Sequence, residues 1–173
     1  MSATMPPQRE EDPLSLDNQL CFALYAASRA LTGLYRELLS EMELTYPQYL
    51  VMLVLWEHGS MPVKEVGVAL RLDSGTLSPL VRRLEEHGLV RRTRCAEDER
   101  VVRVALTEDG SALRERALTI PTRVLRGVGI PGDKVAELRE LLDQITRSAG
   151  SAAAELHSLR HPSNYPTPEG DHT

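Results

Sequence analysis

Residues 72–92 read LDSGTLSPLVRRLEEHGLVRR, and this stretch decides how the rest of the chain is interpreted. Asp73 or Ser74 is suited to cap a helix that would end at Gly88. A shorter helix is predicted just upstream, over residues 63–70, after Pro62 has opened it. Two short helices around a tight turn predict a helix-turn-helix.

The second of these helices has an apolar face and a face suited to nucleic acid. The apolar residues recur at helical spacing: Leu77, Leu80 or Val81, and Leu84. The candidate DNA-contacting residues on its other faces are Ser74, Thr76, Ser78, Pro79, Arg82 and Arg83. Serine and threonine allow close approach to DNA, and arginine binds phosphate or guanine. On propensity alone, Pro79 would end the helix, because it lacks an N–H donor.

Residues 89–95 and 100–106 are β-branched and arginine-rich, and they flank the polar segment AEDE, so they predict a hairpin or wing. Arg94 and Arg100 would lie near its turn, within reach of a minor groove or the DNA backbone. We expect Asp98 to orient the Arg100 guanidinium through a two-pronged salt bridge.

Charge supports this interpretation. The chain carries a formal net charge of -5, but residues 82–103 hold seven arginines against five acidic residues. Positive charge is therefore concentrated where phosphate contact is predicted. The alternative is a winged helix that binds protein, because a fold by itself does not determine function.

Longer helices flank this region. Asp17 is predicted to cap a first helix, Thr45 and Pro47 to begin a second that stops at Gly59, and Thr107 to cap a helix that runs to about Arg126. Pro131 is predicted to open a last, leucine-rich helix. The expected fold is mainly α (α+β), a winged helix-turn-helix with long N- and C-terminal dimerisation helices. The predicted boundaries are a DNA-binding lobe at about 45–106, dimerisation helices at about 16–42 and 107–160 within a domain spanning 14–160, and disordered tails at 1–13 and 161–173.

Composition excludes several classes of protein. The chain has 173 residues, 42% of them hydrophobic, which suits one buried domain. It contains no apolar run long enough for a membrane span and no signal-peptide pattern, so a cytoplasmic location and no membrane partner are expected. Its two cysteines, Cys21 and Cys95, are too few for a disulfide framework and lack zinc-ligand spacing. No metal and no cofactor are expected.

Cys21 is the candidate reactive group. It would lie about one turn into the helix capped by Asp17, where the helix dipole favours a thiolate. Tyr25 shares its helix face, whereas Tyr35 is fourteen residues on, about 21 Å away. In a dimer whose first helices cross antiparallel, Tyr35 of one chain would approach Cys21 of the other and donate a hydrogen bond to its thiolate. The alternative is that Cys21 is a small hydrophobe and both tyrosines are packing residues.

Over residues 14–150 the chain resembles the MarR-type regulators and, within them, the organic hydroperoxide resistance regulators (OhrR). The resemblance rests on residues 16–39 (LDNQLCFALYAASRALTGLYRELL), 44–57 (LTYPQYLVMLVLWE), 72–92, and the wing DER followed by VALTEDG. The first two segments are the more specific, because many MarR-type proteins share the other patterns.

The resemblance implies an obligate homodimer, with first and last helices interlocked, that binds an inverted-repeat operator in double-stranded DNA and represses a peroxidase gene. It implies that an organic hydroperoxide oxidises Cys21 to a sulfenic acid, that Tyr25 and the partner subunit's Tyr35 support the thiol, and that Tyr46 lies nearby. It also implies that Pro79 is tolerated in the recognition helix.

Release from DNA would need a later step such as a mixed disulfide. One branch of the family supplies a second cysteine near the start of the last helix, but residues 120–140 contain none. A low-molecular-weight thiol is therefore the expected resolving partner. Cys95 is interpreted as an incidental thiol, remote from Cys21.

Three other functions are weighed against the sequence. A MarR-type repressor released by reversible binding of a small aromatic ligand would respond without Cys21. A thiol peroxidase is disfavoured, because no histidine is grouped with the cysteine in sequence, and the chain is not expected to be an enzyme. A metal sensor lacks the necessary ligand spacing.

Overall fold

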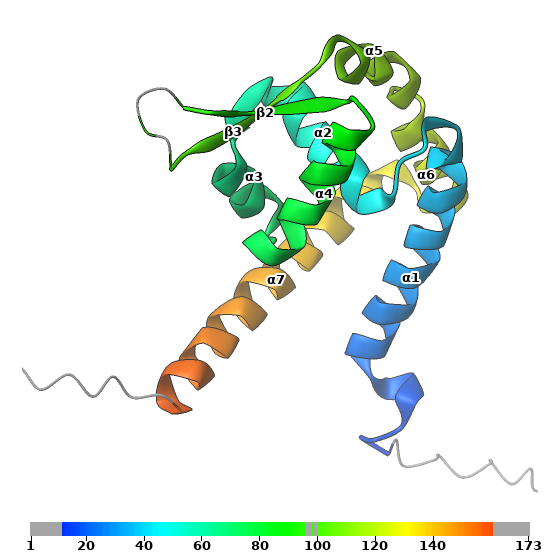
Figure 1. Ribbon diagram of the computed structural model, residues 1–173. Helices are drawn as coiled ribbons and strands as arrows, with labels where there is room; N and C mark the ends of the chain where they lie inside the picture. Colours follow the sequence, from blue (N-terminus) through cyan, green and yellow to red (C-terminus); the bar gives the residue numbers. More distant parts are fainter. Residues whose placement is uncertain (1–11, 96–97, 99, 161–173) are drawn as a thin grey trace, which may run out of the picture. The chain divides into compact units, whose positions relative to one another are not determined.

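The computed structural model describes residues 12–95, 98 and 100–160, arranged as two compact units that divide after Val128. The tails were predicted at 1–13 and 161–173, and of these, residues 1–11 and 161–173 lie outside the described residues. The helices are α1 (Leu20–Leu39), α2 (Tyr46–His58), α3 (Val63–Leu70), α4 (Ser74–Glu86), α5 (Glu108–Ala117), α6 (Ile120–Val128) and α7 (Gly132–Arg160), with 3-10 turns η1 (Leu16–Asn18) and η2 (Ser40–Met42). The strands are β1 (Ser60–Pro62), β2 (Val90–Arg94) and β3 (Val102–Leu106). The predicted class, mainly α with a winged helix-turn-helix, is confirmed (Figure 1).

The helix-turn-helix consists of α3 and α4. Between them Arg71 adopts a left-handed conformation with φ 55°, which reverses the chain. The Asp73 side chain accepts the N–H of Thr76 at 2.8 Å, so Asp73 rather than Ser74 is the cap. The buried face of α4 is Leu77, Val81 and Leu84, so Val81 rather than Leu80 completes the apolar stripe.

Pro79 does not end α4. The expectation from propensity is wrong, because the helix continues through Pro79 to Glu86. Pro79 is exposed, while Leu77, Val81 and Leu84 are buried on the opposite side. Packing of that apolar face therefore outweighs the loss of one helical hydrogen bond.

The predicted hairpin is present. β2 and β3 pair antiparallel with Val90 opposite Leu106 and Arg94 opposite Val102. β1 pairs with the other edge of β3, which makes the sheet order β1-β3-β2. β1 was not predicted, because a three-residue strand is too short to show an alternating pattern. Of the expected turn, only Asp98 is described, and Val101 donates to its carbonyl at 2.9 Å.

The predicted start of the first helix is wrong. Asp17 lies in η1, and Gln19 is the N-cap of α1. The side-chain amides of Asn18 and Gln19 donate back to the carbonyls of Asp12 and Pro13, so local hydrogen bonds replace the expected helical turn. Cys21 is consequently the second residue of α1 rather than one turn inside it.

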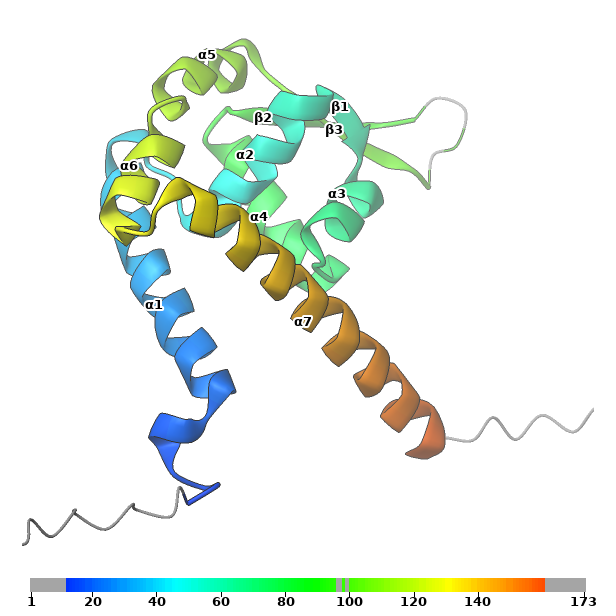
Figure 2. The same cartoon turned by 180° about the vertical axis from the view of Figure 1, so that it is seen from behind.

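The predicted single helix from Thr107 to about Arg126 is also wrong. Thr107 caps α5 through the N–H of Gly110 at 3.0 Å, but α5 ends at Ala117 and α6 begins at Ile120. Pro121, which cannot donate an N–H, falls in the first turn of α6, where no helical donor is needed. α6 packs on α1, with Gly127 against Leu34 (Figure 2).

In the second unit, α7 begins directly after Pro131, as predicted. No described helix is both long and apolar enough to cross a bilayer.

The core of the first unit surrounds α2, which Thr45 and Gln48 cap reciprocally. At the other end of α2, the indole Nε1–H of Trp56 donates to the Gly110 carbonyl at 2.8 Å. A Cβ on Gly110 would clash with the Leu89 carbonyl oxygen. The start of α5 is therefore pressed against the backbone that leads into β2.

Gly110→Ala tests this close approach. We expect it to lower the free energy of unfolding by about 3 kcal/mol, because backbone on both sides must move. Gly33→Ala, where a Cβ would meet nothing within 4 Å, is the matched control, and we expect it to stabilise the protein by up to about 1 kcal/mol. Urea denaturation at one protein concentration measures both. Equal effects of the two variants would contradict this account of the packing.

Candidate functional site

The candidate DNA-contacting residues of α4 are all exposed: Ser74, Thr76, Ser78, Pro79, Arg82 and Arg83. Thr76 also serves the helix cap, since its hydroxyl donates to Asp73 at 3.2 Å. Hydrogen bonds from the Thr76 backbone and then its side chain hold the pKa of Asp73 below its usual value. The cap is therefore charged at neutral pH, beside the helix N-terminus.

The wing places Arg94 and Arg100 on exposed positions near its turn. The expected salt bridge between Asp98 and the Arg100 guanidinium is not among the contacts of the described residues. Asp98 Oδ1 instead accepts the backbone N–H of Arg100 at 3.0 Å. A separation of two residues favours this local turn over a side-chain ion pair. Asp98 therefore shapes the turn that carries Arg100.

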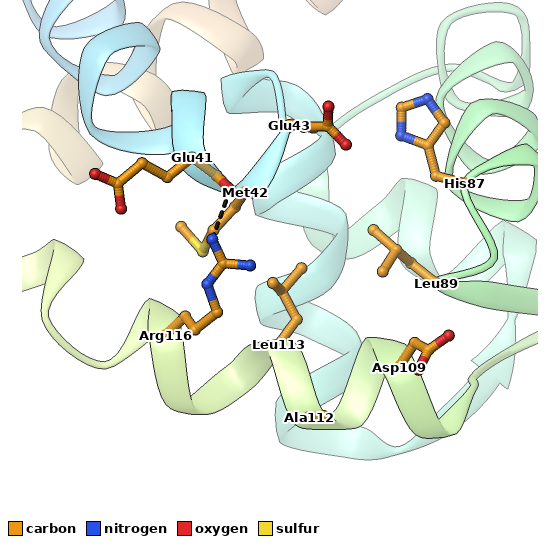
Figure 3. A pocket seen from close by; sticks show the side chains of 9 residues that line it. All are labelled: Glu41, Met42, Glu43, His87, Leu89, Asp109, Ala112, Leu113 and Arg116. Atoms are coloured by element: carbon orange, nitrogen blue, oxygen red, sulfur yellow. Dashed lines mark hydrogen bonds between the residues drawn. The ribbon is translucent and has the colours of Figure 1, made fainter.

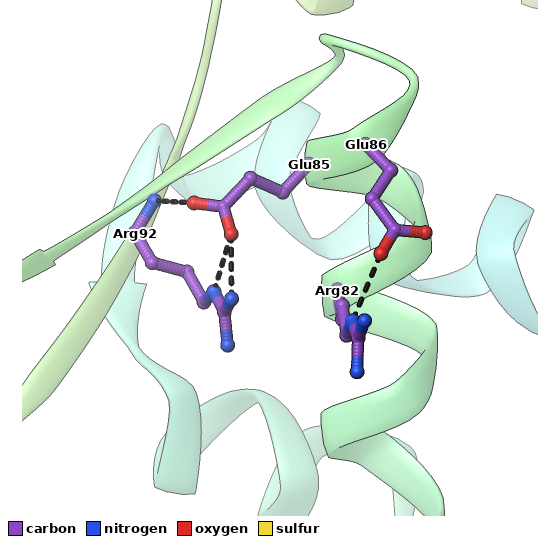
Figure 4. A network of polar contacts seen from close by, with 4 residues as sticks. All are labelled: Arg82, Glu85, Glu86 and Arg92. Carbon is purple, nitrogen blue, oxygen red and sulfur yellow. Dashed lines mark hydrogen bonds and ion pairs between the residues drawn. The ribbon is translucent and has the colours of Figure 1, made fainter.

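The joint between α4 and the wing was missed by sequence reasoning. One Glu85 oxygen accepts the backbone N–H of Arg92 at 2.9 Å, and the other accepts Nε–H at 2.8 Å and lies 2.6 Å from Nη2 (Figure 4). The Arg92 side chain, and then its backbone N–H, lower the pKa of Glu85. Arg82 pairs separately with Glu86 at 2.8 Å. The sequence signal that could have predicted this pair is an acidic residue, Glu85, and an arginine, Arg92, on either side of the turn at Gly88.

Cys21 is exposed in the first turn of α1, at the positive end of the helix dipole. Around it, Leu20 and Phe22 are exposed apolar side chains. Tyr25 is 57% exposed, and its hydroxyl accepts Nη1–H of Arg29 at 3.2 Å. This end of α1 carries a thiol on a largely apolar, open face.

Tyr35 lies near the other end of α1, where it contacts Tyr46, the first residue of α2. Tyr35 stacks on Tyr46 with ring centroids 4.2 Å apart, and it contacts Tyr49 at 5.9 Å. Tyr49 in turn meets Trp56 edge-on at 6.1 Å. Tyr35 and Tyr46 were predicted from the sequence, whereas Tyr49 and Trp56 were missed. The available signal was spacing, because Tyr46, Tyr49 and Trp56 share one face of α2. We call these four rings the aromatic cluster.

Burial raises the pKa of Tyr35 to about 12, and the neighbouring Tyr46 and Tyr49 add to the shift. Burial also raises the pKa of Tyr46 and Tyr49. Their hydroxyls therefore remain protonated at neutral pH and can donate hydrogen bonds to an anion.

Cys21 and Cys95 are not joined by a disulfide. Cys95 follows β2, and Figure 1 shows the wing far from the N-terminal end of α1 within the same unit. Cys95 thus belongs to the wing and not to the thiol region.

A separate hollow lies where η2, the end of α4 and α5 meet (Figure 3). Its lining includes acidic and basic groups, among them Glu43, His87 and Asp109, and Arg116 donates to the Glu41 carbonyl. No group of three metal-ligating side chains occurs in the described part of the chain. The hollow brings none of the predicted site residues together.

Comparison with known proteins gives consistent results. The family model described as "Transcriptional regulator SarA/Rot" matches residues 33–116. An organic hydroperoxide resistance transcriptional regulator of Bacillus subtilis (strain 168) is 48% identical over 131 residues, which cover 76% of this chain and 89% of the relative. The transcriptional regulator TtmR of Methylorubrum extorquens (strain PA1) is 48% identical over 156 residues, covering 90% and 76%. A structure of reduced AbfR bound to DNA is 34% identical, with a TM-score of 0.66, covering 78% of this chain and 93% of that one.

The raised pKa of Tyr35 predicts a pH effect on stability. Because the folded-state pKa is about 12 and the ordinary value is 10.0, the protein keeps the full contribution of Tyr35 below pH 10 and loses it as the pH rises towards 12. Between about pH 9 and 11.5 we expect the Tm of Tyr35→Phe to fall less than that of wild type. Tyr25→Phe, which removes an exposed hydroxyl, should follow wild type. Parallel curves for wild type and Tyr35→Phe would contradict the shift.

Proposed function

The chain belongs to the MarR-type transcriptional regulators and, within them, to the organic hydroperoxide resistance regulators, and we propose that it is a dimeric repressor that releases its operator when an organic hydroperoxide oxidises Cys21. The observation that carries the proposal is an exposed thiol at one end of α1 and a stack of protonated tyrosines at the other. In an antiparallel pair of α1 helices, each thiol would meet the other chain's stack.

The exposed apolar faces of the chain favour a dimer. On α1 they are Leu20, Phe22, Tyr25 and Leu31, and on α7 they are Leu138, Leu141, Leu142, Ile145, Leu156 and Leu159. Side chains of this kind at helical spacing on two long helices suit an interface with a second copy. We assign residues 16–42 and 107–160 to dimerisation and 45–106 to DNA binding.

The oxidation step requires only Cys21 and the peroxide. The thiolate attacks the terminal peroxide oxygen, so an S–O bond forms while the O–O bond breaks, and the alkoxide takes a proton and leaves as an alcohol. Sulfur is oxidised and the peroxide is reduced. A low-molecular-weight thiol then displaces water from the sulfenic acid and leaves a mixed disulfide on Cys21.

The tyrosine hydroxyls of the aromatic cluster support this chemistry because they stay protonated at neutral pH. A thiolate near Tyr35 and Tyr46 would accept hydrogen bonds from hydroxyls that stay protonated. Tyr25, four residues after Cys21, would cover the thiol from its own chain.

DNA binding is assigned to α4 and the wing. The residues that would face the major groove are Ser74, Thr76, Ser78, Pro79, Arg82 and Arg83, with serine and threonine permitting close approach. Arg94 and Arg100 would reach the backbone or the minor groove, while Asp98 shapes the turn between them. The similar AbfR was solved bound to DNA, which supports DNA as a ligand of this chain. The inverted repeat is proposed from the two-fold symmetry of a dimer.

Within one chain, a series of contacts leads from Tyr35 towards the wing. Tyr35 stacks on Tyr46, and the cluster extends through Tyr49 to Trp56. Trp56 bonds to the Gly110 carbonyl, and Gly110 abuts the backbone that leads into β2. An adduct on Cys21 would displace the partner subunit's Tyr35 and shift this connected set. A small rotation would spoil the spacing of two recognition helices about one turn of DNA apart.

A second candidate function is release by reversible binding of an aromatic acid. A groove favours it, because its lining combines the rings of Tyr49 and Trp56 with the cation Arg114, although the lining also includes Glu57. Such a repressor would be insensitive to loss of Cys21. The relatives are named as transcriptional regulators, which supports a regulatory role under either candidate.

Fluorescence anisotropy on the DNA upstream of the protein's own gene tests the proposal. With cumene hydroperoxide and cysteine at constant salt, we expect wild type and Cys95→Ser to release DNA and Cys21→Ser to stay bound. If Cys21→Ser also released DNA on addition of peroxide, the thiol mechanism would be wrong. If salicylate without peroxide released both wild type and Cys21→Ser from DNA, the second candidate function would be established instead.

A further inference from the structure

We propose that Arg92, held in position by Glu85, contacts a DNA phosphate. β2 and α4 would then bind the sugar-phosphate backbone of the same DNA strand. This rests on the proposed DNA binding and adds two residues to it. The Glu85 carboxylate accepts hydrogen bonds from the backbone N–H and the Nε–H of Arg92, and it forms an ion pair with Nη2. The two side chains are 38% and 34% exposed, so the pair is half-buried rather than freely solvated.

The geometry leaves part of the guanidinium available. An arginine has five N–H donors in a planar fork, and Glu85 engages its Nε and Nη2 side. Figure 4 shows the remaining nitrogen of Arg92 turned away from Glu85, in the same direction as the outer end of Arg82 on α4. Two guanidinium groups, each held from behind by a carboxylate, thus face the same side.

A guanidinium held in place by a carboxylate is suited to bind a phosphate. Exposed arginines lose side-chain freedom when they bind, whereas Arg92 is already held in one conformation. Its partner Glu85 stands at the end of the helix that would read the groove, so the contact would fix the wing relative to α4. The alternative is that the Glu85–Arg92 pair only fastens β2 to α4.

Arg91 provides a matched control. It precedes Arg92 on β2 and is exposed, but alternate residues of a strand point to opposite faces. Arg91→Gln and Arg92→Gln therefore remove the same charge from neighbouring positions on different faces.

The test is the salt dependence of binding by the full-length protein to its own upstream DNA and to an unrelated duplex. We expect Arg92→Gln to lower the slope of log K against log salt by about two for a dimer, one for each Arg92, on both duplexes. Arg91→Gln should leave the slope at the wild-type value. An unchanged slope in Arg92→Gln would overturn the proposal, even if its Tm fell. Wild type that fails to bind its upstream DNA better than the unrelated duplex would instead contradict the proposed function.

Glu85→Gln tests the positioning role. Gln keeps an acceptor for the Arg92 N–H but loses the charge that holds the guanidinium. We expect weaker DNA binding, roughly fivefold, with an unchanged salt slope, and no further loss when it is added to Arg92→Gln. Tighter binding, or an equal loss in both backgrounds, would show that Glu85 does not act through Arg92.

Discussion

The stacking of Tyr35 on Tyr46 joins the first helix to the buried helix of the core, beside the buried Leu38 and Leu39 of α1. α1 supplies one ring and the first residue of α2 supplies the other, 4.2 Å apart. A ring pair of this kind contributes about 0.5–1.5 kcal/mol beyond the area it buries. Because Thr45 and Gln48 also cap α2 at this point, the aromatic stack and the start of α2 form one local unit. Any change near Tyr35 therefore acts on the core directly.

At the opposite end of α2 the packing is equally close. Trp56 bonds to the Gly110 carbonyl, and Gly110 leaves no room for a side chain beside Leu89. Beyond Leu89, Glu85 holds Arg92 on the wing. α2 thus lies between the tyrosines at one end and the recognition helix and wing at the other. A repressor that converts a thiol modification into a change in DNA affinity needs such a rigid connection, because loose packing would absorb the displacement.

Local chemistry was predictable from the sequence, and longer-range contacts were not. Thr45 and Thr107 were recognised at helix starts, and Asp73 was one of two candidate caps, since each acts on an N–H three residues away. Asp17 was not a cap, because the amides of Asn18 and Gln19 form competing hydrogen bonds. Pro79 stays within a helix held by its buried face, while Pro121 begins a new one. The Glu85–Arg92 pair spans the turn at Gly88, so no helical or strand period reveals it. The nearness of Tyr46 to Tyr35 followed from a family resemblance, and Tyr49 and Trp56 emerged only from the packing. The roles of Cys21, Tyr25, Tyr35 and Tyr46 stay predictions.

Mixed dimers test the central claim, that Tyr35 of one chain supports Cys21 of the other, most directly. In one mixed dimer, one chain carries Cys21→Ser and the other Tyr35→Phe, so the remaining Cys21 faces an intact Tyr35. In the second, one chain carries both changes and the other is wild type, so the remaining Cys21 faces a partner whose Tyr35 has been replaced. Both dimers carry Cys95→Ser in each chain, so that one Cys21 is the remaining cysteine. The measurement is the rate at which cumene hydroperoxide converts this thiol to sulfenic acid, followed by dimedone labelling. The account predicts a near wild-type rate for the first dimer and a clearly slower one for the second, whereas equal rates or the reverse order would contradict it.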